Sequence, residues 1–186
     1  MRILFAGLFA LLVSSTLVLM PAQAETLILD WEDLVPAKGK GEVLSIPGNA
    51  PTLGTPRRED YDGTDDEYEE MLEVYEAQRY MQPQGVSIRS DLNGKTVRIP
   101  GFITPLEIDG EKVVEFLLVP YVGACIHVPS PPGNQIIYIS KIKGITLDNM
   151  YDPIWITGKL KAKPLATILA DVGYHMENVK IEPYVE

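Results

Sequence analysis

Residues 95–119, KTVRIPGFITPLEIDGEKVVEFLLV, decide the fold of this chain. Residues 95–103 alternate between apolar and polar positions, which is typical of a half-buried strand, and Pro100-Gly101 indicates a bulge or bend within it. Asp109-Gly110 is a strong hairpin signal, so residues 112–119 are expected to return as the next strand. The segment therefore predicts a hairpin in a β-rich domain.

Further strands are predicted on the C-terminal side of the hairpin, at residues 135–140, 154–160 and 176–181. Several short strands separated by Gly and Pro turns favour a small barrel or sandwich, and five strands suggest a partly open barrel of the oligonucleotide/oligosaccharide-binding (OB) type. Residues 164–172 are expected to form a short helix that starts at Pro164 and stops at Gly173. The predicted fold class is mainly β with two helices, built on a small five-stranded, OB-like barrel.

The first 24 residues have the pattern of a cleaved signal peptide. Arg2 supplies a positive charge, an apolar run follows, and Ala22-Gln23-Ala24 is a small-residue cleavage motif. The alternative is a retained transmembrane helix, because the apolar run is near spanning length. We predict export to the periplasm, with no stable membrane span after cleavage.

An arm and a helix are predicted between the signal peptide and the hairpin. Residues 26–36 alternate weakly, and the Gly- and Pro-rich sequence that follows is typical of a loop without regular structure. Thr64-Asp65-Asp66-Glu67 is a capping box that opens an amphipathic helix, which Pro83 terminates. The predicted organisation is an extended arm and linker over 25–63, then a helix plus β-barrel domain over 64–186.

The overall composition excludes several classes of function. The chain has 186 residues, 16 Lys and Arg against 26 Asp and Glu, and a formal net charge of −10. Such an acidic chain is unsuited to nucleic acid, because phosphate backbones are bound mainly by clustered Lys and Arg. The single cysteine cannot form an internal disulfide, so packing must hold the fold. The sequence contains no P-loop, Cys-x-x-Cys or Gly-x-Ser-x-Gly motif.

The most chemically capable stretch is the loop at residues 120–135, PYVGACIHVPSPPGNQ. On an extended backbone, Cys125 and His127 would point the same way and could share one ion. Thiolate and imidazole together suit zinc, and copper(I) is an alternative because it favours thiolate. A tight zinc site needs further donors, which the fold would have to supply from Glu107, Glu115 or His175. The candidate binding residues are Tyr121, Cys125, His127, Pro129 and Asn134.

Three other interpretations of this loop stay open. Cys125 can be a buried small hydrophobe while His127 holds the loop by a backbone hydrogen bond. A thiol-dependent enzyme would use Cys125 as nucleophile and His127 as base, which requires a lowered thiol pKa. An interaction module would use residues 129–132, since proline-rich segments keep an extended shape and dock to aromatic grooves.

Several motifs make the chain resemble a known family. They are WEDLVP at 31–36, GKTVRIPGF at 94–102, PLE at 105–107, FLLVPY at 116–121, GACIHVP at 123–129 and NQ at 134–135. With them the sequence resembles domain-of-unknown-function family 3299, exported proteins of Gram-negative bacteria without an established activity. Some relatives are encoded near transport components linked to metal supply, so the resemblance implies envelope transporter components as partners.

Taken together, these observations predict a periplasmic, non-enzymatic accessory protein. It would bind a ligand or a metal (zinc or copper(I)) through the loop that carries Cys125 and His127, in support of envelope metal transport.

Overall fold

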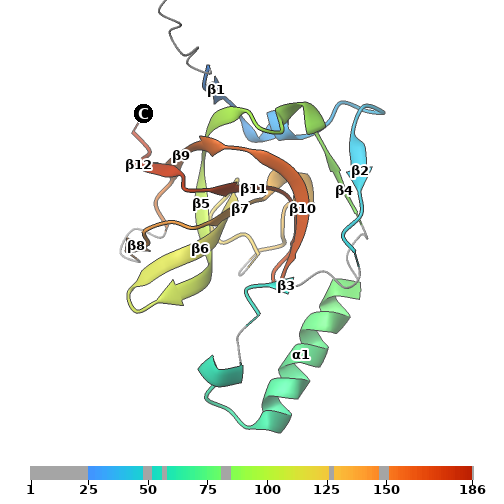
Figure 1. Ribbon diagram of the computed structural model, residues 1–186, viewed down its shortest axis with the longest axis vertical. Helices are drawn as coiled ribbons and strands as arrows, with labels where there is room; N and C mark the ends of the chain where they lie inside the picture. The colour runs from blue at the N-terminus through green and yellow to red at the C-terminus, as the bar shows by residue number, and fades with distance from the viewer. Residues whose placement is uncertain are drawn as a thin grey trace, which may run out of the picture.

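The computed structural model describes residues 25–47, 52–55, 58–80, 85–125, 128–146 and 151–185. Within these ranges the chain forms a large mixed sheet, a small two-stranded sheet and one α-helix (Figure 1). The large sheet contains β1 (Leu27–Ile28), β3 (Thr52–Leu53), β5 (Thr96–Asp109), β6 (Lys112–Val119), β7 (Ile137–Ser140), β8 (Ile145–Thr146), β9 (Ile154–Lys159), β10 (Lys161–Thr167), β11 (Asp171–Glu177) and β12 (Lys180–Pro183). The small sheet pairs β2 (Glu42–Leu44) with β4 (Val86–Ile88). Short 3₁₀ turns occur at η1 (Trp31–Leu34), η2 (Arg58–Asp60), η3 (Ser90–Leu92) and η4 (Gly133–Gln135).

The predicted hairpin is confirmed as β5 and β6, which pair in antiparallel register around the turn at Gly110. The first half of β5 pairs with β9 and the second half with β6, with the change of partner after Gly101. A side chain at Gly101 would meet Leu118 and Trp31 at 2.9 Å, so the glycine allows the sheet to pack closely there. The irregular register lies further along, between Pro105 and Ile108.

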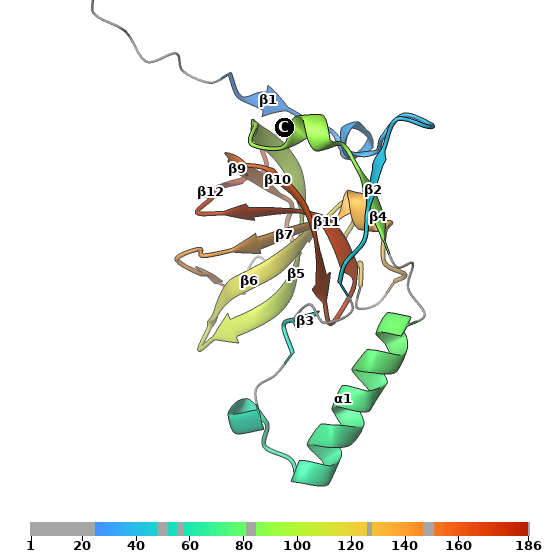
Figure 2. The same ribbon diagram turned by 45° about the vertical axis from the view of Figure 1, so that its right-hand side comes forward.

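The mainly β class is confirmed, but the five-stranded OB-like barrel is not. The large sheet has ten strands in the order β12-β9-β5-β6-β7-β11-β10-β3, with β1 and β8 added on β5 and β6. The end strands β12 and β3 do not pair with each other, so the sheet curls without closing (Figures 1 and 2).

The prediction of a second helix at residues 164–172 is wrong. Residues 164–167 belong to β10, and β11 begins at Asp171. Thr167 makes the turn between them, because its hydroxyl donates to the Ala170 carbonyl and accepts from the Ala170 amide at 2.7 and 3.1 Å. Pairing of β10 with β11 therefore overrides the local helix signal.

The N-terminal arm packs on the sheet, and parts of the predicted linker form strands. β1 pairs with β5 in parallel, and Leu34 at the end of η1 is fully buried. The Tyr174 hydroxyl donates to the Leu34 carbonyl at 2.8 Å and accepts the Arg89 amide at 2.8 Å, which ties the arm to β11. Within the predicted irregular segment, β2 pairs with β4 and β3 pairs with β10. Residues 1–24, the predicted signal peptide, lie outside the described residues.

The capped helix is confirmed as α1 (Asp65–Tyr80). The Thr64 amide donates to the Glu67 carboxylate at 2.8 Å, and the Glu67 amide donates to the Thr64 hydroxyl at 3.3 Å. Both views show α1 standing away from the large sheet, beyond β3 (Figures 1 and 2). None of the helices among the described residues has the length and apolar character needed to cross a membrane.

Two buried clusters lie on opposite faces of β6 and β7. The main core includes Leu34, Ile99, Phe116, Leu118, Ile137, Ile139, Ile156, Tyr174 and Met176. The second cluster, which we call the loop-side core, contains Leu117, Val119, Ala124, Ile136, Tyr138, Ala170 and Val172. Alternate residues of β6 and β7 enter different clusters, as the strand period requires. The loop between β6 and β7 therefore packs against the sheet through Ala124.

Candidate functional site

The loop at residues 120–135 is held by hydrogen bonds at several points. The buried Thr104 hydroxyl donates to the Ala124 carbonyl at 2.9 Å. The Val128 amide donates to the Gly123 carbonyl at 3.2 Å. The exposed Tyr121 hydroxyl donates to the Pro129 carbonyl at 2.8 Å. These bonds close the loop on itself and on β5. Ile126 and His127 lie outside the described residues.

Cys125 is half-buried and contacts the loop-side core. Its φ of 68° lies in the left-handed region, which non-glycine residues seldom adopt. Burial raises the pKa of the Cys125 thiol, and a hydrogen bond with the Ser130 side chain opposes that rise to a smaller extent. The environment therefore favours the neutral thiol over the thiolate that a nucleophile or a metal ligand needs.

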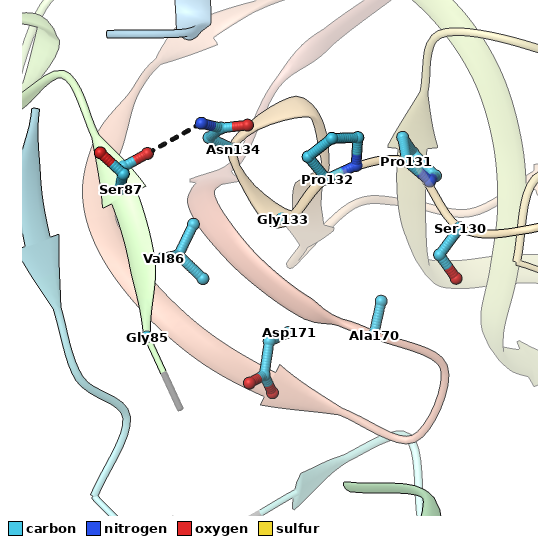
Figure 3. A pocket seen from close by; sticks show the side chains of 10 residues that line it. All are labelled: Gly85, Val86, Ser87, Ser130, Pro131, Pro132, Gly133, Asn134, Ala170 and Asp171. Atoms are coloured by element: carbon cyan, nitrogen blue, oxygen red, sulfur yellow. Dashed lines mark hydrogen bonds between the residues drawn. The ribbon is translucent and has the colours of Figure 1, made fainter. Parts of the chain in front are cut away.

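A pocket of about 400 Å³ opens beside this loop (Figure 3). Its walls come from three segments that are distant in sequence: the start of β4, the proline end of the loop, and the turn into β11. The lining residues are Gly85, Val86, Ser87, Ser130, Pro131, Pro132, Gly133, Asn134, Ala170 and Asp171. Asp171 is the one ionisable side chain among them, so the lining is acidic and otherwise neutral.

Gly133 and Asn134 connect the loop to the other two walls of the pocket, β4 and the start of β11. The Asn134 side-chain amide donates to the Ser87 carbonyl at 3.0 Å, while its Oδ1 is buried without a partner among the described residues. A Cβ on Gly133 would lie 2.6 Å from the Asp171 carbonyl oxygen and 3.0 Å from a Val86 methyl group. The loop can approach β4 and β11 this closely because residue 133 has no side chain.

The predicted binding residues separate into two groups. Asn134 lines the pocket, together with its neighbours Ser130 to Gly133. Tyr121, Cys125 and Pro129 do not line it; Tyr121 and Pro129 are joined at the outer edge of the loop. The predicted role of His127 lies outside the described residues.

The carboxylates predicted as extra metal ligands lie next to each other on the sheet. Glu107 and Glu115 are directly opposite in the pairing of β5 and β6. The Tyr138 hydroxyl donates to Glu115 at 2.5 Å, and burial together with this carboxylate raises the pKa of Tyr138. Glu115 is therefore already engaged as a hydrogen-bond acceptor.

His175, the remaining predicted ligand, is on β11, two strands away from Glu115, and lies opposite Tyr138 in the pairing of β7 and β11. It is buried, with 8% of its surface exposed, and its Nδ1 has no partner among the described residues. Burial, then the positive charge of Lys161, lower the pKa of His175. Across the described residues, no three His, Cys, Asp or Glu side chains come together as a set that could hold a metal ion.

Sequence reasoning missed the residues that complete the pocket. Val86, Ser87, Ala170 and Asp171 come from segments without a chemical motif, and one of these segments was expected to be helical. Gly133 carried a usable signal, because a glycine after two prolines is typical of a close backbone approach.

The Cys125 environment leads to a measurable expectation. At neutral pH, Cys125 should react with iodoacetamide more slowly than glutathione does, because burial disfavours the thiolate. The midpoint of the rise in reaction rate with pH should lie at a higher pH for Cys125 than for glutathione. Replacing Ser130 by Ala should move the midpoint further upward, since the hydrogen bond that lowers the pKa is lost. When they are unfolded in urea, the unsubstituted protein and the Ser130→Ala variant should both react at the same rate as glutathione. A folded-state midpoint below that of glutathione would revive the nucleophile hypothesis.

Comparison with known proteins identifies the family. No curated protein matches the chain. The crystal structure of a DUF3299 family protein from Pseudomonas aeruginosa PAO1 is similar, with 35% sequence identity and a TM-score of 0.61, over 87% of this chain and 98% of that one. The family profile described as "Protein of unknown function (DUF3299)" matches residues 31–183. The chain therefore belongs to the DUF3299 family.

Proposed function

We propose that this chain is a non-enzymatic binding protein of the cell envelope, in which the proline end of the loop forms one wall of a ligand site. The observation that carries the proposal is the pocket built by Ser130 to Asn134 against β4 and β11. Its volume of about 400 Å³ lies in the range of small-molecule sites, which is roughly 300–1,000 Å³.

The backbone of this site is organised before any ligand arrives. Pro131 is buried and Pro132 has its φ fixed by its ring, so residues 131–132 lose little entropy when a ligand binds. Gly133 is packed against Asp171 and Val86, and Asn134 is tied to Ser87. A wall that is fixed in advance contributes affinity, because less conformational freedom is lost on binding.

The chemistry of the lining favours a ligand that donates hydrogen bonds. The lining contains an acidic side chain, Asp171, and the Ser130 hydroxyl, but no basic side chain. The surrounding chain has a net charge of −10, which attracts cations over long range. We therefore infer a small molecule that carries an ammonium group and has an apolar part to lie against the prolines.

Thermal unfolding with a panel of small amines tests this function. Putrescine, lysine and glycinamide are the probes, and acetate is the anionic comparison. A probe at a hundred times its Kd should stabilise the protein by about 2.7 kcal/mol, which corresponds to a rise in Tm of roughly 5–10 °C for a chain of this size.

Matched variants locate the effect. Ser130→Trp places a bulky side chain at the exposed rim of the pocket and should remove the rise in Tm. Ser45→Trp introduces the same side chain at an exposed position outside the pocket and should keep it. The proposal fails if no amine raises Tm, or if Ser130→Trp responds as the unsubstituted protein does.

Metal binding through Cys125 and His127, zinc or copper(I) as the ion, and envelope transporters as partners stay predictions. We place the pocket first because it is described completely, whereas His127 lies outside the described residues. The raised pKa of the Cys125 thiol counts against Cys125 as a catalytic nucleophile.

A further inference from the structure

We propose a second binding site, for an anionic amphiphile, at the open side of the large sheet. A pocket of about 670 Å³ lies between β8, the residues around it, and the segment that leads into β12. Figure 1 shows β8 and β12 on the same side of the molecule, at the left. This site shares no lining residue with the pocket of the proposed function, so the two proposals are independent.

The floor of this pocket is apolar and continuous with the main core. Ile142, Ile145, Val179 and Ile181 line the pocket, and each is only partly buried while it packs against the main core. Such a surface would normally be covered by a neighbouring strand. Here the four side chains face the pocket directly. An apolar chain placed here would bury them further, which is favourable by about 0.8 kcal/mol per methylene group.

The rim of the pocket is basic, in contrast to the chain as a whole. Lys112, Lys141 and Lys143 line it, and no acidic side chain does. Lys141 pairs with Glu177 at 3.0 Å, whereas Lys112 and Lys143 make no ion pair with any described residue. Asp109 lies opposite Lys112 in the hairpin register. Among the described residues, these two lysines of the rim therefore have no carboxylate in an ion pair with them.

The backbone holds this rim in place. Gly144, with a φ of 88°, lies against Lys112 so closely that a Cβ there would meet the lysine stem at 2.9 Å. Lys112 is also paired with Thr146 of β8. Lys141 and Asn178 both adopt left-handed φ values, 56° and 52°, where β7 and β11 end side by side. Non-glycine residues in this region are uncommon and cluster at functional sites.

An acyl chain with a single anionic headgroup matches both the apolar floor and the basic rim of this pocket. Its chain would lie on the four aliphatic residues, and its headgroup would meet Lys112 and Lys143. A volume of about 670 Å³ is within the range of roughly 300–1,000 Å³ for small-molecule sites.

Calorimetric titration of the purified protein with dodecanoate, below its aggregation concentration, tests the site. We expect one saturable site, with affinity that increases several-fold from octanoate to dodecanoate as more methylene groups are buried. Dodecyltrimethylammonium, with the opposite charge, and inorganic phosphate, without a chain, should bind much more weakly.

The double substitution Lys112→Gln/Lys143→Gln should weaken dodecanoate binding about tenfold, since each partly exposed charge contact contributes roughly threefold. Lys38→Gln removes one charge at an exposed position away from the pocket and should change the affinity by less than about twofold. The same purified proteins can be checked for folding by their thermal unfolding.

Several results would overturn the inference. They are an absence of dodecanoate binding, equal binding of dodecyltrimethylammonium or phosphate, no dependence on chain length, and an unchanged affinity in the double variant. Sedimentation with anionic phosphatidylglycerol vesicles separates a monomeric ligand from a bilayer. Binding to vesicles without binding to dodecanoate would mean that this face meets a membrane surface and that the pocket does not enclose a chain.

Discussion

Tyr174→Phe is expected to lower the free energy of unfolding by about 3 kcal/mol, although it removes a single oxygen atom. Tyr174 is fully buried, and its hydroxyl serves two backbone groups at 2.8 Å each, the Leu34 carbonyl and the Arg89 amide. Phenylalanine fills the same space but leaves both groups without this partner. An unsatisfied buried backbone group costs about 1–3 kcal/mol, and the half-buried Arg89 amide adds to the loss at the buried Leu34 carbonyl, so the total exceeds the cost of most single substitutions.

Urea unfolding followed by tryptophan fluorescence measures this effect. Tyr151→Phe is the matched control, because Tyr151 is 65% exposed, and it should change stability by less than about 0.5 kcal/mol. Hydrogen exchange at the Arg89 amide gives a second readout, since that amide should lose protection in Tyr174→Phe. Equal stabilities for the two variants would show that the hydroxyl does not hold the arm.

Gly133→Ala is expected to destabilise the protein by about 2 kcal/mol and to deform the pocket of the proposed function. The added Cβ would lie 2.6 Å from the Asp171 carbonyl oxygen, which belongs to the backbone and cannot rotate away. The loop or the start of β11 must therefore shift, and the Asn134 bond to Ser87 would be strained with it. Any rise in Tm produced by an amine should be reduced in the same variant.

Ser45→Ala is the control for Gly133→Ala, because Ser45 is exposed and does not line the pocket. It should alter stability by less than about 0.5 kcal/mol. Comparable losses in the two variants, or a Gly133→Ala protein as stable as the original, would contradict the close approach of the loop to β11.

The features that sequence analysis predicted correctly depend on local signals. The β5–β6 hairpin follows from Asp109-Gly110, and α1 follows from the Thr64 capping box; in each case the deciding residues are close neighbours in sequence. The errors concern pairing between distant segments. β3 joins β10, and residues 164–167 become a strand because β11 is available to pair with them. No local pattern contains that information.

The candidate site divides in the same way. Asn134 and the prolines were found within the loop, because their residue types are conformationally restricted or chemically distinctive. The opposite walls, Val86 and Asp171, are ordinary residues that gain their role only when β4 and β11 come together. The partners of Tyr174 were missed for the same reason, since a tyrosine in a strand does not indicate which carbonyl it will reach.

The bond between Tyr174 and Leu34 also bears on the timing of folding. It joins residues 140 positions apart, so the arm cannot complete its native contacts before β11 is in place. Contacts between such distant residues slow folding, because a long loop must close first. The native packing of the arm against β11 therefore forms only after that loop has closed, late in the folding of this protein.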